Sequence, residues 1–131
     1  MRALFALAPF ALIAACATSG PAVDGRISPD VDATVQMTAG LNFAPAAITV
    51  NAGDTVQFQN ISSFVHTVST SPDTTRERQE TRLPAGAAAF DSGEIAPGAT
   101  WNHTFTTPGT YQYFCEPHLS TGMVGTVIVR P

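Results

Sequence analysis

Charge is scarce in this chain of 131 residues. Charged residues make up 12% of the sequence, against roughly a quarter in an average soluble domain. Only six residues are Lys or Arg, and the formal net charge is −4. The chain therefore lacks a basic stripe that could neutralise a phosphate backbone, and we expect no nucleic acid among its partners.

Hydrophobic runs long enough to cross a membrane are also missing. The apolar stretch at residues 3–15 is shorter than the roughly 20 residues that a membrane-spanning helix needs. It ends in small residues before Cys16, after which the chain becomes polar, and this order resembles a signal peptide with a bacterial lipobox. We predict a lipoprotein-type signal peptide over residues 1–15, a lipid anchor at Cys16, and an exported protein held to a membrane that faces the periplasm or the cell exterior. An ordinary secretory signal would leave Cys16 incidental.

Cysteine is limited to two residues, Cys16 and Cys115. In an exported protein, two cysteines favour a disulfide by default. If Cys16 carries lipid, however, Cys115 has no partner, and a lone thiol in an oxidising compartment is open to oxidation. A bound metal ion would protect it.

Turn residues and short alternating segments dominate the rest of the chain. Residues 16–30 are small and polar, which predicts a flexible tether. Beyond them, apolar and polar residues alternate between Gly- and Pro-containing turns, without long helical periodicity. The expected strands cover residues 33–38, 48–50, 55–60, 66–70, 88–92, 100–105, 110–114 and 123–129. Eight short strands in about 100 residues predict an all-β, antiparallel β-sandwich domain over residues 31–131.

Residues 71–86 break this rhythm and hold three of the six basic residues. Ser71 could cap a short helix, with Pro72 at its first position and Asp73 near its positive end. A solvated loop between strands fits the same residues equally well. The sequence assigns this segment no chemistry.

Three soft or borderline ligands lie within nine residues near the C-terminus: Cys115, His118 and Met123. Each has a structural explanation, because Cys and Met fill cores and a loop His is usually solvated. Together, directly after an expected strand, they indicate a metal site. Zinc is a poor candidate, since structural zinc takes four Cys or His ligands. Two His, one Cys and a weak axial Met describe a blue-copper electron-transfer site.

A second imidazole must come from elsewhere in the chain. His66 follows an expected strand and a short apolar turn, which places it at one end of the sandwich. His103 lies inside an expected strand, where alternation puts it on one face with Trp101 and Phe105. We therefore predict His66 as the second ligand.

At these residues the chain shows a family resemblance. CEPH at residues 115–118, followed by GMVG at residues 122–125, resembles the ligand loop of plastocyanins and halocyanin-like cupredoxins, which share the spacing Cys-x2-His-x4-Met. Residues 41–56 are similar to the opening strands of that family, and residues 93–109 to its later turns. The resemblance implies an eight-stranded Greek-key cupredoxin sandwich that holds one type 1 copper ion. The implied ligands are His66, Cys115, His118 and an axial Met123.

The resemblance also implies what the protein does. It would carry single electrons by cycling between Cu(II) and Cu(I), as a monomer without catalytic turnover, and would meet a redox donor and acceptor by transient contact. Electrons would leave through His118. The implied docking surface is the apolar rim around that residue, formed by Leu41, Phe64, Val65 and Leu119.

Three residues next to the ligands would shape the site: Thr67, Pro117 and Gly122. Thr67 stands where plastocyanins usually have Asn. Its backbone N–H could still reach the thiolate, and its hydroxyl could replace the side-chain link between the ligand loops. Phe114 stands where plant plastocyanins have a surface Tyr, and no acidic residues cluster near it in sequence. We therefore do not expect the acidic docking site of the plant proteins.

Other classes of function remain to be separated by experiment. A copper enzyme needs an open coordination position or a second metal, and only His103 is left for one. A copper chaperone or store usually has a Met-rich or multi-Cys site, whereas this chain has three Met including the first residue. A metal-free adhesion-type sandwich would leave Cys115 unexplained.

Overall fold

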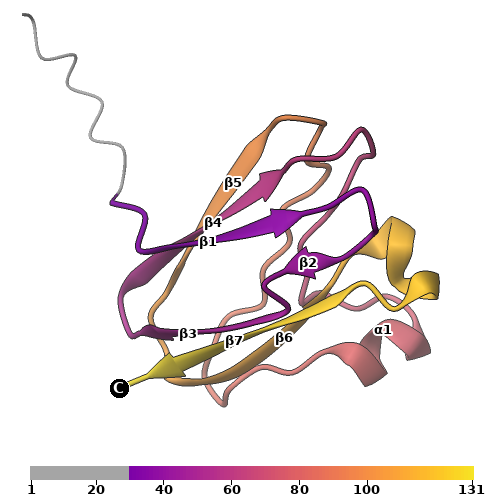
Figure 1. Ribbon diagram of the computed structural model, residues 1–131. Coiled ribbons are helices and arrows are strands. Elements are labelled where there is room, and N and C mark those ends of the chain that lie inside the picture. The colour runs from indigo at the N-terminus through magenta and orange to yellow at the C-terminus, as the bar shows by residue number, and fades with distance from the viewer. Residues whose placement is uncertain (1–29) are drawn as a thin grey trace, which may run out of the picture.

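The computed structural model describes residues 30–131, so the predicted signal peptide, the Cys16 anchor and nearly all of the tether lie outside the described residues. Seven strands form in this range, in two sheets (Figure 1). The first sheet has the order β2-β1-β4-β5 and the second the order β3-β7-β6. The strands are β1 (Ala33–Met37), β2 (Phe43–Ala44), β3 (Ala47–Asn51), β4 (Asp54–Asn60), β5 (Thr100–Phe105), β6 (Gly109–Phe114) and β7 (Val124–Arg130).

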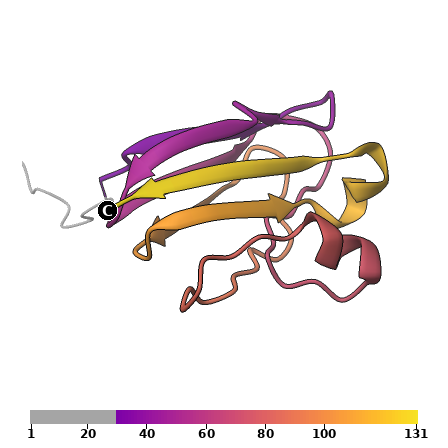
Figure 2. The same cartoon turned by 90° about the horizontal axis from the view of Figure 1, so that it is seen from below.

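The two sheets face each other as the layers of a sandwich, which confirms the predicted all-β class (Figure 2). Both sheets are mixed. β1 runs parallel to β4 and β3 runs parallel to β7, whereas the remaining neighbours are antiparallel. The parallel pairs arise because the chain visits the other sheet between them, since β3 lies between β1 and β4 in sequence but in the opposite layer.

Two of the eight expected strands, residues 66–70 and 88–92, do not form extended ladders. They make isolated bridges instead, from His66 to Ile95 and from Ser69 to both Asp91 and Phe114. Residues 66–70 are buried at every position, so they lack the outward-facing alternation of a surface strand. The short strand β2 was not predicted.

Residues 71–86 contain the helix α1 (Thr75–Glu80). Its N-cap is Thr74 rather than the predicted Ser71. A capping box explains the later start, because the Thr74 hydroxyl accepts from Glu77 N–H and the Glu77 carboxylate accepts from Thr74 N–H. Gln112 of β6 donates to the Glu80 carbonyl at 2.8 Å, so the helix is fastened beside the second sheet.

The core lies between the sheets and is built from inward-facing apolar and aromatic side chains. Val35 and Met37 of β1 and Val127 and Val129 of β7 belong to this core, all at most 3% exposed. Tyr113 packs edge-on against Phe58, with ring centroids 5.3 Å apart. Within residues 30–131, no helix is long and apolar enough to cross a membrane.

Candidate metal centre

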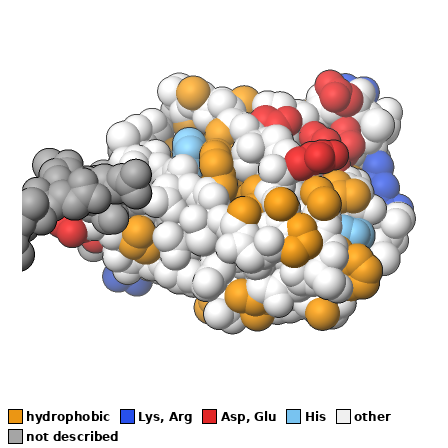
Figure 3. All heavy atoms as spheres, turned by 90° about the horizontal axis from the view of Figure 1, so that it is seen from above, with side chains coloured by type: hydrophobic (Ala, Val, Ile, Leu, Met, Phe, Trp, Pro, Cys, Tyr) orange, Lys and Arg blue, Asp and Glu red, His pale blue; other side chains and the backbone are white. Residues whose placement is uncertain are grey.

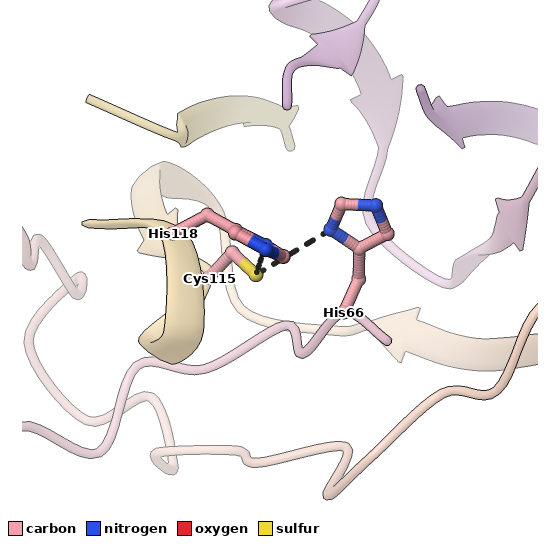
Figure 4. Close-up of side chains that lie close together, drawn as sticks. All are labelled: His66, Cys115 and His118. Atoms are coloured by element: carbon pink, nitrogen blue, oxygen red, sulfur yellow. Dashed lines mark hydrogen bonds between the residues drawn. The ribbon is translucent and has the colours of Figure 1, made fainter. Parts of the chain in front are cut away.

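Three predicted ligands meet at one end of the sandwich. His66 lies in the loop that follows β4, Cys115 directly follows β6, and His118 lies in the 3-10 helix η1 (Glu116–Thr121). Cys115 Sγ is 3.6 Å from His66 Nδ1 and 3.4 Å from His118 Nδ1, and all three donor atoms lie within 4.8 Å of one another. Both imidazoles point toward the sulfur (Figure 4).

The predicted axial residue, Met123, is held beside these donors by the backbone of its loop. Cys115 N–H donates to the Met123 carbonyl at 3.0 Å, and Met123 N–H donates to the His118 carbonyl at 3.3 Å. Pro117 stands in the first turn of η1, and Gly122 ends it in the left-handed conformation at φ 83°. This tight backbone turn brings Cys115, His118 and Met123 together, and Met123 is 1% exposed.

Thr67 links the two loops that carry the candidate ligands. Its backbone N–H donates to Cys115 Sγ at 3.4 Å, and its hydroxyl accepts from Glu116 N–H at 2.8 Å. The loop that carries His66 is thus tied to the loop that carries Cys115 at two adjacent points.

Burial shifts the pKa of two of the candidate ligands, Cys115 and His66. The pKa of the Cys115 thiol is raised by burial, against which the hydrogen bonds from Thr67 and His118 act to lower it. The pKa of His66 is lowered by burial and by the nearby His118, while the Thr38 carbonyl acts to raise it. Neutral imidazoles are the form in which histidine binds metals, whereas the thiol must lose its proton to bind.

Two residues that the sequence did not point to support His66 from behind. Ser62 Oγ lies 2.9 Å from His66 Nε2, and Asn60 Oδ1 lies 2.8 Å from Ser62 Oγ. Asn60 is fully buried and Ser62 is 9% exposed. The only sequence signal was an Asn-x-Ser sequon, which has no bearing on this role.

His103 lies apart from this cluster, on β5, as strand alternation predicted. Its ring stacks on Trp101 with centroids 5.4 Å apart and contacts Phe90 at 4.2 Å. Burial lowers its pKa. Its surroundings are aromatic, and among the described residues it joins no group of metal-binding side chains.

The predicted docking residues differ in exposure. Phe64 is 47% exposed and Val65 39% exposed, and Phe64 meets the half-buried His118 edge-on. Leu119 is only 6% exposed, because η1 turns it inward, so it offers little surface to a partner. Leu41 is half-buried and packs against the core, with a positive φ of 58°.

Acidic side chains do cluster near the site, contrary to the expectation from sequence. The pKa of Glu116 is raised by burial and by the negative charges of Asp91, Glu77 and Asp73. Asp73 and Glu77 belong to one segment at the start of α1, and Asp91 and Glu116 lie in two others. Only the fold brings them together. Figure 3 shows such a group of acidic side chains next to hydrophobic ones and a histidine.

A hollow of about 450 Å³ lies beside the candidate ligands. It is lined by Val65, Thr67, Glu94, Glu116 and Pro117, so two carboxylates face it. Phe114, which stands where the plant proteins have a surface Tyr, is completely buried, and its backbone pairs with that of Ser69.

Comparison with known proteins shows which family this chain resembles. The sequence model of the copper binding proteins of the plastocyanin/azurin family matches residues 29–130. The chain belongs to this family. It is 39% identical to a chloroplast plastocyanin of Tetradesmus obliquus over 97 residues, which are 71% of this chain and 61% of that protein. It is 37% identical to a plastocyanin of Scenedesmus fuscus over 106 residues, covering 76% of this chain and all of that protein.

Solved structures show the same fold. Oxidised plastocyanin from Dryopteris crassirhizoma aligns with a TM-score of 0.56 and 26% identity, covering 74% of this chain and 99% of that one. A copper-containing nitrite reductase from Thermus scotoductus aligns with a TM-score of 0.59 and 27% identity, but only 22% of that chain is covered. The match thus reaches one cupredoxin-like part of the larger enzyme.

The cofactor of this family, copper, fits the residues at this site. The donor set is one sulfur and two imidazole nitrogens, the combination that suits copper better than the harder divalent ions. The three donor atoms lie within 4.8 Å of one another, two of the three residues are fully buried, and the backbone of the thioether residue Met123 pairs with that of Cys115. One copper ion is therefore the cofactor that this centre accommodates.

Proposed function

We propose that this chain is a type 1 copper electron carrier that passes single electrons between redox partners and catalyses no reaction of its own. The observation that carries the proposal is the convergence of His66, Cys115 and His118 within 4.8 Å, in a chain of the plastocyanin/azurin family. Copper would supply the one-electron change between Cu(II) and Cu(I). The protein would supply a fixed set of donors.

In this proposal His66 and His118 bind through Nδ1 and Cys115 through its thiolate, with Met123 as a weak axial ligand. Thr67 donates to the thiolate and stabilises its negative charge. A closed, buried donor set favours electron transfer over catalysis, because an enzyme needs an open position for substrate. The similarity to nitrite reductase covers too little of that chain to favour an enzyme here.

His118 is the proposed electron exit because it is the one ligand candidate that is partly exposed. Phe64 and Val65 beside it form a small apolar surface suited to brief encounters. The acidic side chains around Glu116 adjoin this surface and would favour a partner with a basic docking face. One copy of the chain supplies this whole docking surface, so we propose that the protein acts as a monomer.

Export and anchoring remain part of the proposal. The apolar run at residues 3–15 and Cys16 support a lipoprotein, and Cys115 would then keep its thiol for copper. Replacing Cys16 with Ala should release the protein from membranes into the soluble export fraction. Attachment that persists in this variant would remove the lipid anchor from the proposal.

The test of function is the visible spectrum after Cu(II) is added to the purified domain. We expect an intense thiolate-to-copper band that ascorbate bleaches. His103→Ala should keep the band, because His103 lies in the aromatic cluster of β5. A colourless protein with full copper occupancy would contradict the proposal.

A further inference from the structure

The imidazole of His66 has a second nitrogen whose partner is fixed by the fold. Nδ1 faces Cys115 Sγ, and Nε2 lies 2.9 Å from Ser62 Oγ. A neutral imidazole carries one proton, on either Nδ1 or Nε2. The position of that proton decides whether Nδ1 has a free lone pair to offer a metal ion.

The orientation of the buried Asn60 amide starts a chain of proton assignments. Asn60 Nδ2 lies 2.7 Å from the Phe64 carbonyl oxygen and 2.9 Å from the Ile95 carbonyl oxygen. Carbonyl oxygens only accept hydrogen bonds, so the side-chain atom that faces both of them must be the NH₂ group. Asn60 Oδ1 therefore faces Ser62, whose backbone N–H donates to it at 3.0 Å.

The Ser62 hydroxyl has one proton, which it donates in a hydrogen bond to Asn60 Oδ1. The two oxygens are 2.8 Å apart, and any other orientation of the hydroxyl would set their lone pairs against each other. The longer alternative, the Phe64 carbonyl at 3.3 Å, is also only an acceptor. Ser62 Oγ is left to accept, from Phe64 N–H at 3.1 Å and from His66 Nε2–H.

We propose that Asn60 and Ser62 are positioning residues that hold His66 in its Nε2–H form, so that the Nδ1 lone pair is directed at the metal site before any metal binds. Every polar atom in this relay is satisfied: Asn60 donates twice and accepts twice, and Ser62 Oγ donates once and accepts twice. The relay would be lost if Asn60, Ser62 or His66 were replaced by a residue that cannot donate and accept the same hydrogen bonds.

This inference has two parts, and only the second rests on the proposed function. The tautomer of His66 is a property of the metal-free protein. The benefit for copper follows from it, because fixing the ring and its proton before binding removes an ordering cost, and losing such a partner typically weakens metal affinity about 10- to 100-fold.

The first experiment is ¹⁵N NMR of the imidazoles in the metal-free protein. We expect His66 to be protonated on Nε2 and unprotonated on Nδ1, and this measurement on the unaltered chain needs no variant. Ser62→Ala should let the Nδ1–H form appear, while Ser62→Thr, which keeps the hydroxyl, should restore the Nε2–H form. Ser63→Ala, at the exposed neighbouring position, is the matched control and should behave as the unaltered chain.

Two outcomes of the NMR experiment would overturn the proposal. The first is an Nδ1–H tautomer of His66 in the unaltered chain. The second is a Ser62→Ala variant that keeps a single Nε2–H tautomer, since the Thr38 carbonyl, which also acts on this imidazole, would then be sufficient.

The second experiment measures Cu(I) affinity by competition with a chromophoric chelator. We expect Ser62→Ala to bind Cu(I) about 10- to 100-fold more weakly, and Ser62→Thr and Ser63→Ala to bind as the unaltered chain. Unchanged affinity in Ser62→Ala would overturn the positioning role. If the unaltered chain takes up no copper while His66 shows the expected tautomer, the proposed function fails and the assignment of the relay stands.

Discussion

The two loops that supply the candidate ligands are built in opposite ways. The loop that carries His66 is held by buried polar side chains, above all the fully buried Asn60, which makes four hydrogen bonds. The loop that carries Cys115, His118 and Met123 is held mostly by its own backbone, which folds into the 3-10 helix η1 and closes on Cys115. The first loop therefore depends on particular side chains, and the second on a tight turn.

The two loops also differ in how far they expose their histidines. His66 is completely buried, while His118 is half-buried and lies beside the exposed Phe64. A side-chain network suits a ligand that must not move, and a backbone turn can present a ligand at the surface without adding polar groups to the docking face. The thiolate of Cys115 lies where the two loops meet.

The largest effect is expected at that meeting point. Cys115→Ser removes the sulfur that faces both imidazoles, so the blue thiolate-to-copper band should vanish altogether. Absorption spectra of the copper-loaded protein measure this directly. A band that survives the change would mean that Cys115 is not the ligand. It would contradict the claim that the two loops meet at the Cys115 sulfur in the copper site.

The side-chain-built loop should be the more sensitive to a single truncation. Asn60→Ala removes four hydrogen bonds and leaves the carbonyls of Phe64 and Ile95 without this donor, so we expect a loss of about 2–4 kcal/mol in the free energy of unfolding. Urea unfolding of the metal-free domain measures it. The exposed Asn102 provides a control, since Asn102→Ala should change stability by less than about 0.5 kcal/mol.

The backbone-built loop should respond instead to a change in conformational freedom. Gly122 has φ 83°, and a Cβ there would meet nothing within 4 Å, so Gly122→Ala should cost about 1 kcal/mol through backbone strain alone. Gly122→Asn should cost less, because Asn tolerates this conformation better. Thermal unfolding measures both. Equal losses for Ala and Asn would show that something other than φ sets the cost.

The link between the loops should give an effect as small as that of Gly122→Ala. Thr67→Val removes the hydroxyl that accepts from Glu116 N–H but keeps the backbone N–H that donates to Cys115 Sγ. We expect a loss of about 1 kcal/mol in stability, recovered by Thr67→Ser, with the blue band retained. Loss of the band in Thr67→Val would show that the hydroxyl, rather than the backbone, maintains the thiolate geometry.

The same contrast between the two loops explains which parts of the candidate site could be predicted from the sequence. Cys115, His118 and Met123 stand within one short segment with a characteristic spacing, so the second loop was predictable from local sequence. His66 could be chosen over His103 because strand alternation placed the two in different surroundings. The β-sandwich followed from the alternating segments, although the parallel pairings did not, because they depend on which layer each strand joins.

What the sequence could not show depends on contacts between distant segments. No motif points to the role of Asn60 and Ser62, which appears only once the Phe64 and Ile95 carbonyls are in place. The acidic group around Glu116 is assembled from segments far apart in sequence, so no run of acidic residues in the sequence indicates it. The segment at residues 71–86 was ambiguous between helix and loop, and its contact with the ligand loop, from Arg76 to the Leu119 carbonyl at 3.2 Å, spans 43 positions in sequence.

The central proposal, a single-electron carrier built on these two loops, is tested most directly by a spectroelectrochemical titration of the copper-loaded domain. We expect one copper ion per chain and a blue band that disappears and returns reversibly, following a one-electron Nernst curve, with no consumption of oxygen or nitrite. A band that does not follow a reversible one-electron curve, or copper that turns over either substrate, would contradict it.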